Sequence, residues 1–135
     1  MKNRYSLILK VHGIILLCIG LIMTLQIILG SFKGIGALKF IYGDAIKSAG
    51  LFEAYLLAAF SGVVLIILSG KHYVKGWHLL AATVHLILFT TNILFWNAYA
   101  LAGITMIGYV STTAHALFIF LESGCYIKLK FKPAE

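Results

Sequence analysis

The sequence predicts an all-α, multi-pass membrane protein, an antiparallel bundle of four transmembrane helices, because three observations agree. First, 61% of its 135 residues are hydrophobic and only 11% are charged, with a mean hydropathy of +1.00. Soluble domains are about half apolar and about a quarter charged. Second, the apolar residues gather into four long runs. Third, the lysines and the single arginine fall almost entirely between and outside these runs.

Each run is long enough to cross a hydrocarbon core of about 30 Å as a helix that rises about 1.5 Å per residue. Lipid offers no hydrogen-bond partners to a backbone, so each span is expected to be helical. We predict spans at residues 11–29, 51–69, 77–97 and 101–121, in one domain covering residues 1–135.

The connections between the spans predict their arrangement. Residues 70–76 form a tight basic turn and residues 97–103 a short uncharged turn, so spans two, three and four are expected to be antiparallel neighbours. The first connection is longer, and its segment ALKFIYGDAIK predicts a short interfacial helix.

Basic residues predict the orientation, since cytoplasmic loops carry an excess of lysine and arginine. With both termini inside, the cytoplasmic side holds eight basic residues and the opposite side three, Lys33, Lys39 and Lys47. We therefore expect N and C termini in the cytoplasm and a location in the cytoplasmic (inner) membrane. The formal charge of +7 is divided among termini and loops, which argues against nucleic acid as a partner.

The third span contains polar residues at a regular interval. In WHLLAATVHLILFTTNILFWNAY a polar residue recurs every seven positions, at His78, His85, Asn92 and Tyr99. A seven-residue step returns nearly to the same side of a helix, so these residues form one ridge. The fourth span carries a second ridge (Gly108, Ser111, His115, Phe118 and Glu122), and the first span places His12 and Gln26 on one side. Polar groups in lipid turn inward, so the ridges are expected to face the bundle interior.

The antiparallel register predicts two polar levels. His85 and His115 are expected to share a level in the inner half, with His78, Glu122 and His12 closer to the cytoplasmic boundary. An outer level would hold Gln26, Glu53 and Asn92. Glu53 is the only carboxylate well inside a span in the outer half, where it needs a partner, a proton or water.

Several chemistries are open to these residues. The cofactor-binding candidates are His85, His115, His12 and His78, because haem b is held by two facing imidazoles. A tight hairpin works against this reading, since a porphyrin needs space between its helices. A metal ion is a second option, because three histidines with Glu122 offer ligands that zinc or iron accepts, although no HxxxH or ExxH spacing marks a metal site. A proton relay is the third option, since imidazole titrates near neutral pH, and its candidates include Glu53, Glu122, Asn92 and Gln26. Hydrogen bonding between helices is the purely structural alternative.

Small residues at four-residue steps predict close helix contacts. They occur at Ala54, Ala58 and Gly62 in the second span and at Gly108, Thr112 and Ala116 in the fourth. Such stripes let backbones approach closely without a hydrophobic driving force.

Two short segments resemble a known family. ALKF at residues 37–40 and AGLFE at residues 49–53 look like the DoxX-like family of small bacterial membrane proteins. The likeness covers the first half of the chain and maps the glutamate of the family's second span onto Glu53. It implies a four-helix membrane subunit linked to redox complexes, often in an accessory role.

Together these observations predict a small integral membrane subunit with a buried His/Glu interior, associated with a membrane redox complex through haem, quinone or metal. Its partners would be the lipid bilayer and either other subunits or further copies of the chain. The alternatives are a non-catalytic accessory or assembly subunit and an oligomeric pore or proton pathway. Motifs of soluble enzymes, such as GxSxG and the Walker loop, are absent from the sequence, and the question of enzymatic activity stays open.

Overall fold

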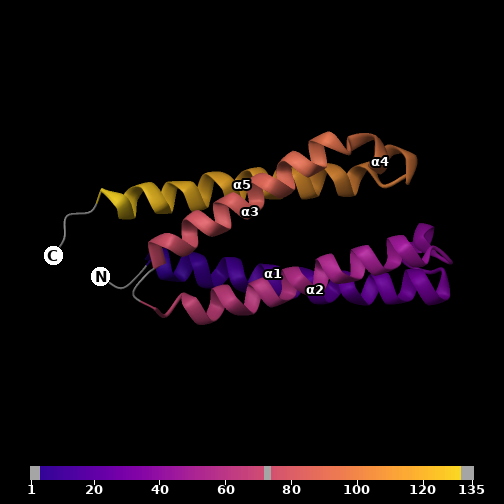
Figure 1. The fold of residues 1–135 in the computed structure, drawn as a ribbon, viewed down its shortest axis with the longest axis horizontal. Helices are drawn as coiled ribbons and strands as arrows, with labels where there is room; N and C mark the ends of the chain where they lie inside the picture. The colour runs from indigo at the N-terminus through magenta and orange to yellow at the C-terminus, as the bar shows by residue number, and fades with distance from the viewer. Residues whose placement is uncertain (1–3, 72–73, 132–135) are drawn as a thin grey trace. The chain divides into compact units, whose positions relative to one another are not determined.

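The computed structural model describes residues 4–71 and 74–131, and every regular element within them is helical. In chain order these elements are α1 (Arg4–Lys33), the 3-10 helix η1 (Lys39–Ile41), α2 (Ala45–Leu68), α3 (Val74–Leu94), α4 (Trp96–Leu101) and α5 (Thr105–Lys130). The chain divides into two compact units, residues 1–71 and 72–135. Each is a helical hairpin, α1 with α2 and α3 with α5 (Figure 1). The all-α class is confirmed.

Three of the described helices, α1, α2 and α3, are long and apolar enough to cross a membrane. The most apolar part of α1 has a mean hydropathy of 2.5 but only 22% of its residues are buried, and for α2 the values are 2.3 and 17%. So large an exposed apolar surface is unfavourable in water, whereas contact with the acyl chains of lipids is favourable. Helix α5 has 26 residues but is not among these three, because Ser111, His115 and Glu122 interrupt its apolar run. Its role as a fourth span, the joining of all four spans in one bundle and the orientation of the termini stay predictions.

Close backbone contact joins α1 to α2. A Cβ atom added at Gly62 would lie 2.5 Å from the carbonyl oxygen of Gly13, and one added at Gly20 would lie 2.6 Å from the backbone nitrogen of Ala59. The predicted contact stripe of α2, Ala54, Ala58 and Gly62, is therefore partly wrong. Gly62 contacts α1, but the second contact is made by Ala59, and Ala54 is exposed. A step of three rather than four residues keeps the contacts on one side where helices cross at a shallow angle.

The connection between α1 and α2 folds back onto the hairpin. Leu38 and Ile41 are buried against Ile27, with Phe52 and Tyr55 of α2 packed beside them. The predicted interfacial helix over residues 37–47 is instead a 3-10 turn followed by the start of α2, which begins at Ala45 rather than at residue 51. The side chain of Asp44 accepts the backbone N–H of Lys47 and caps α2, a favoured N-terminal arrangement.

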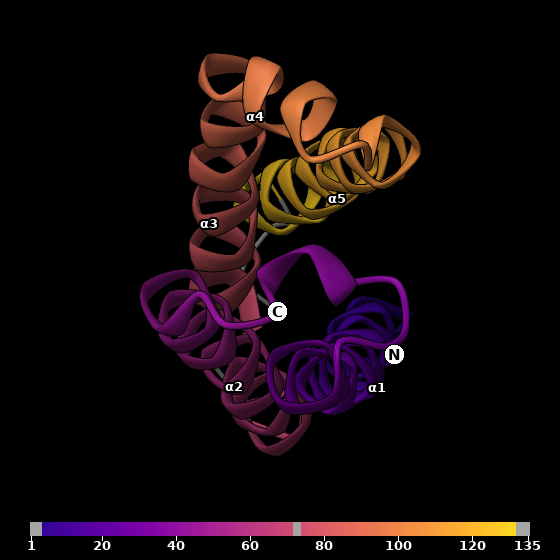
Figure 2. The ribbon, with the colours of Figure 1, turned by 90° about the vertical axis from the view of Figure 1, so that its right-hand side faces the viewer.

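Helix α3 ends earlier than predicted. It stops at Leu94, Phe95 leaves the helical conformation (φ −104°, ψ 26°), and the predicted turn at residues 97–103 is largely the short helix α4. Figure 2 looks along the helices and shows α4 in the link between α3 and α5. The turn back into α5 uses Gly103, whose φ of 69° suits glycine. The predicted basic turn at residues 70–76 lies partly outside the described residues, as do Lys2 and Lys132.

Candidate functional site

The polar ridges of α3 and α5 face each other. His78, His85 and Asn92 are all buried on α3, Glu122 is fully buried on α5, and His115 is half-buried. Most large apolar side chains of the same helices are exposed instead. The seven-residue pattern therefore marks the side of α3 that packs against α5, as predicted.

One pair lies toward the N-terminal end of α3. Nδ1 of His78 contacts a carboxylate oxygen of Glu122, and both side chains are fully buried. The contact satisfies one ring nitrogen of the buried imidazole and one oxygen of the buried carboxylate inside the hairpin. Nε2 of His78 has no hydrogen-bond partner among the described residues.

A second pair lies two turns further along α3. Nδ1 of His85 and Nδ1 of His115 are 2.8 Å apart, and the ring centroids are 5.1 Å apart. The two imidazoles therefore share a level, as the antiparallel register predicted. The ring of His85 also stacks on Phe118, with 4.8 Å between centroids and 14° between planes.

Hydrogen bonds extend from this pair toward α4. Nε2 of His115 lies 3.4 Å from the Ser111 hydroxyl, which accepts a 3.1 Å bond from the Asn92 amide. The Asn92 carbonyl oxygen accepts a 2.7 Å bond from the Tyr99 hydroxyl. Tyr99 thus extends the ridge as predicted, but from α4 rather than from a continuous third span. The sequence placed Ser111 on the ridge, but no role was predicted for it. Its spacing of four residues from His115 was the signal that could have predicted contact between the two side chains.

One assignment of the ring protons gives these groups a consistent order of donors. The Asn92 amide donates to Ser111 Oγ, so the Ser111 proton is free to go to His115 Nε2. A His115 that accepts at Nε2 carries its proton on Nδ1 when neutral, and donates it to Nδ1 of His85. The donors then all point one way, from Tyr99 through Asn92, Ser111 and His115 to His85.

Tyr99 forms the end of the series in α4. Burial raises the pKa of the Tyr99 phenol, while a hydrogen bond with Ser111 acts in the opposite direction. The phenol therefore stays protonated near neutral pH and acts as a donor. Asn92 orients the series and does not itself carry protons, because its amide does not release protons near neutral pH.

The remaining site candidates lie in the α1–α2 hairpin. His12 is buried on α1. The Gln26 side chain accepts the backbone N–H of Ala37 at 3.3 Å, so it holds the connecting loop. Glu53 is exposed on α2, whereas the neighbouring Phe52 and Tyr55 pack against the connection between α1 and α2.

A haem between His85 and His115 does not fit this geometry. Metal–imidazole bonds are about 2 Å long, so two nitrogens on opposite sides of one metal lie about 4 Å apart. The Nδ1 atoms are only 2.8 Å apart, and Phe118 covers the His85 ring. Nor do three or more His, Cys, Asp or Glu side chains gather into a possible metal site within residues 4–71 and 74–131.

Comparison with models of protein families, with curated proteins and with solved structures finds no match for this chain.

Proposed function

We propose that the protein is a small multi-pass membrane subunit whose α3–α5 hairpin transfers protons. The observation that carries this proposal is the series of donors and acceptors from Tyr99 to His85, which is partly buried along the largely apolar helices α3 and α5. Imidazole is suited to the task because it gains and loses a proton near neutral pH.

The transfer step follows from the shared proton. An excess proton arriving at Nε2 of His115 makes an imidazolium whose Nδ1–H already points at Nδ1 of His85. Passage of that Nδ1 proton to His85 moves the positive charge across the pair and leaves His115 neutral. The pair favours a single excess proton, because two adjacent imidazolium rings repel each other and cannot keep this hydrogen bond.

The apolar layer between the two titratable levels controls the next step. On α5 this layer contains Phe118, and on α3 it contains the buried Ala81 and Ala82. His78 lies seven residues from His85, about 10 Å along the helix, which is too far for direct transfer. Water beside Phe118 would complete the path to His78 and Glu122, so this layer is where the rate of transfer is set.

The membrane arrangement belongs to the same proposal. We place α5 as the fourth span beside α1, α2 and α3, with both termini in the bacterial cytoplasm. The excess of basic residues near the termini and residues 71–75 supports this orientation. The His78–Glu122 pair then lies near the cytoplasmic boundary, and Tyr99 lies near the outer one.

We keep the association with a membrane redox complex as part of the proposal. Its support is the resemblance of residues 37–40 and 49–53 to the DoxX-like family. In that setting the α3–α5 hairpin would supply protons to a neighbouring redox subunit or remove protons from it. A quinone would be held where the hairpin meets that subunit.

An accessory role without proton transfer is the second candidate. It is favoured by the way the ridge residues hydrogen-bond one another across α3 and α5. Such bonds stabilise helix pairs in membranes by about 0.6 kcal/mol on average.

Proton flux into liposomes separates the two candidates. The full chain is reconstituted with a pH-sensitive dye inside, and a potassium diffusion potential drives protons. We expect flux above that of protein-free liposomes, lost in His115→Ala and in His85→Ala. Thr113→Ala is the matched control, because Thr113 is exposed on the same helix.

Wild-type flux equal to that of empty liposomes, or flux that persists in His115→Ala, contradicts proton transfer. A His115→Ala protein that is less thermostable but shows no change in flux supports the accessory role instead.

A further inference from the structure

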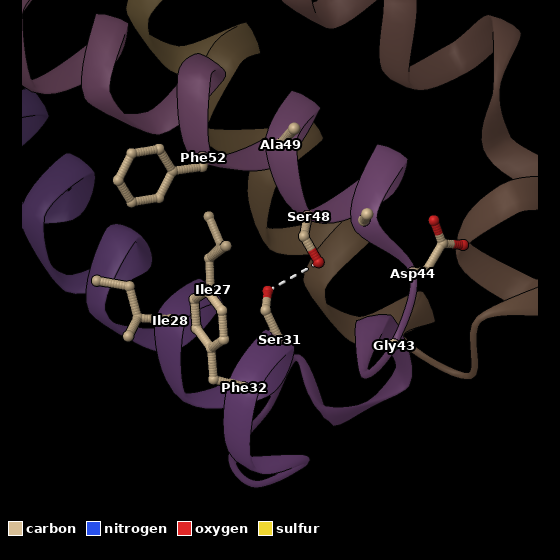
Figure 3. Close-up of a pocket in the computed structure, with 10 residues that line it drawn as sticks. Ile27, Ile28, Ser31, Phe32, Gly43, Asp44, Ser48, Ala49 and Phe52 are labelled. Carbon is tan, nitrogen blue, oxygen red and sulfur yellow. Dashed lines mark hydrogen bonds between the residues drawn. The ribbon is translucent and has the colours of Figure 1, made fainter.

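A pocket opens in the α1–α2 hairpin, and no residue of the polar ridges of α3 and α5 lines it. It lies between the C-terminal turns of α1 and the first turns of α2, and its volume is about 480 Å³. Pockets that bind small molecules measure roughly 300–1,000 Å³ and are mostly apolar with a few placed polar groups. Figure 3 shows such a lining, with Ile27, Ile28 and Phe32 from α1 and Phe52 from α2.

Two serines form the polar centre of the pocket. Ser31 of α1 and Ser48 of α2 point toward each other, and the Ser31 hydroxyl donates to Ser48 Oγ at 2.8 Å (Figure 3). The Ser48 hydroxyl in turn donates to the carbonyl oxygen of Ile41 at 3.4 Å. Both hydroxyl protons are committed, so the serine oxygens offer only lone pairs to a guest.

The charged residues at the rim do not call for an ionic guest. The Asp44 carboxylate is turned away from the serine pair (Figure 3), caps α2 and pairs with Lys47 Nζ at 2.7 Å. A helix N-terminus attracts anions, and here the chain's own carboxylate meets that demand. A phosphate group would face this carboxylate and find no free donor on the serines.

The pocket lies where a membrane amphiphile would place its head. It lies at the loop end of two helices that are long and apolar enough to cross a membrane. The Phe32 ring, 74% exposed, extends the apolar wall outward. An acyl chain would pack along Ile28 and Phe32, with its head group at the level of the serines.

We propose that this pocket binds a neutral membrane lipid that carries a free hydroxyl group. The hydroxyl donates to the serine pair, and the hydrocarbon part covers the exposed walls formed by Ile28 and Phe32. This site is independent of the proposed proton transfer, because it uses no residue of α3, α4 or α5.

Photocrosslinking in lipid nanodiscs tests the proposal. The full chain is placed in phosphatidylcholine, whose head group has no hydrogen-bond donor, with a trace of diacylglycerol bearing a diazirine in one acyl chain. The matched probe is the same molecule with its hydroxyl converted to a methyl ether. We expect crosslinks within residues 27–52, roughly two- to tenfold more abundant for the alcohol, which corresponds to one hydrogen bond.

Three variants of the chain test the proposal further. Ala49→Trp fills the pocket and should abolish these crosslinks, whereas Ala54→Trp, an exposed alanine of the same helix that does not line the pocket, should retain them. The double variant Ser31→Ala, Ser48→Ala removes both acceptor oxygens, so it should equalise the two probes and leave a lower, shared level of labelling.

Equal labelling of the wild-type protein by the alcohol and the ether overturns the proposal, and shows a groove that holds hydrocarbon without recognising a head group. Crosslinks spread evenly over the exposed apolar residues of α3 and α5 overturn it as well. The comparison of the two probes on the wild-type chain stands even if a variant fails to fold.

Discussion

At the scale of single residues, polar side chains in this apolar chain meet two different fates. Thr83, Thr90 and Thr91 of α3 each donate to the carbonyl oxygen four residues earlier in their own helix, at 2.9–3.0 Å. Such local bonds satisfy a hydroxyl without a neighbouring helix. His85 and Asn92 instead bond to α5. The ridge is therefore the set of residues whose hydrogen-bonding needs are met only when α3 and α5 pack together.

Gly108 positions the phenol at the end of this series. A Cβ atom at Gly108 would lie 2.8 Å from Cγ of the Tyr99 ring, so the ring rests directly on the glycine. We expect Gly108→Ala to displace Tyr99, weaken its bond to Asn92 and destabilise the hairpin by about 1–3 kcal/mol, the usual cost of overpacking. The midpoint of thermal unfolding and the emission of Trp96, whose ring lies 5.8 Å from that of Tyr99, report the change.

Gly124→Ala is the control for this substitution. Gly124 lies in the same helix, and an added Cβ would meet no atom within 4 Å. Alanine favours a helix by up to about 1 kcal/mol over glycine, so this variant should be as stable as the wild type or more stable. Equal unfolding midpoints for the two variants would show that the contact between Gly108 and Tyr99 does not support the hairpin.

Asp44 makes stability depend on pH. The hydrogen bonds and charge of Lys47 lower the pKa of the Asp44 carboxyl below its ordinary value of 3.8. The folded chain then binds this proton more weakly than the unfolded chain. The resulting stabilisation is present above the unfolded pKa and is lost as the pH falls through the folded pKa.

The test compares unfolding midpoints between pH 7 and pH 3 in detergent micelles. Asp44→Asn keeps a good helix cap but removes the charge, so its midpoint should fall less steeply on acidification than that of the wild type. Parallel pH profiles for the two proteins would assign no role to the Asp44–Lys47 pair.

At the scale of helices, the regular spacing of polar residues predicted which sides of α3 and α5 pack together. The seven-residue spacing in α3 located the face that packs on α5, and antiparallel register paired His78 with Glu122 and His85 with His115. Helix α4 was missed because no glycine or proline marks the break at Phe95. The face that α2 turns to α1 could not be predicted from Glu53, because the cost of a charged group in lipid does not determine helix rotation, and the contacts of Ala59 and Gly62 set that face.

Those contacts make the α1–α2 hairpin sensitive to one methyl group. Gly62→Ala places a Cβ 2.5 Å from the carbonyl oxygen of Gly13 and 2.6 Å from the backbone nitrogen of Leu17. Backbone atoms cannot swing aside, so the helices must separate. We expect a loss of about 1–3 kcal/mol, measured by thermal unfolding followed by circular dichroism. Gly50→Ala, in the same helix with no atom within 4 Å of the new Cβ, should cause no loss.

At the scale of the whole molecule, surface chemistry and length support a membrane protein more directly than any single site does. Large apolar side chains are exposed along α1, α2, α3 and α5. Helix α5 is less apolar than the other three because the polar residues of its ridge, which form half of the hydrogen-bond series, lower its mean hydropathy. Hydropathy alone does not identify α5 as a span, so whether it crosses the membrane must be tested by accessibility.

Cysteine labelling tests that span and the orientation together. Cys18 and Cys125 are first replaced by serine, and single cysteines are introduced at exposed positions: Ala100 before α5, Lys130 at its end, Ile35 in the connection between α1 and α2, and Lys71 after α2. A membrane-impermeant maleimide is added to intact cells and, separately, to opened cells. A helix of 26 residues is about 39 Å long, enough to separate its ends across the bilayer. We expect labelling at positions 35 and 100 in intact cells, and at positions 71 and 130 only after the cells are opened.

Labelling of positions 100 and 130 from the same side would remove α5 as a span and would place the C-terminus outside. The two ends of the hydrogen-bond series would then no longer face opposite compartments, and the hairpin would lose the path on which proton transfer depends.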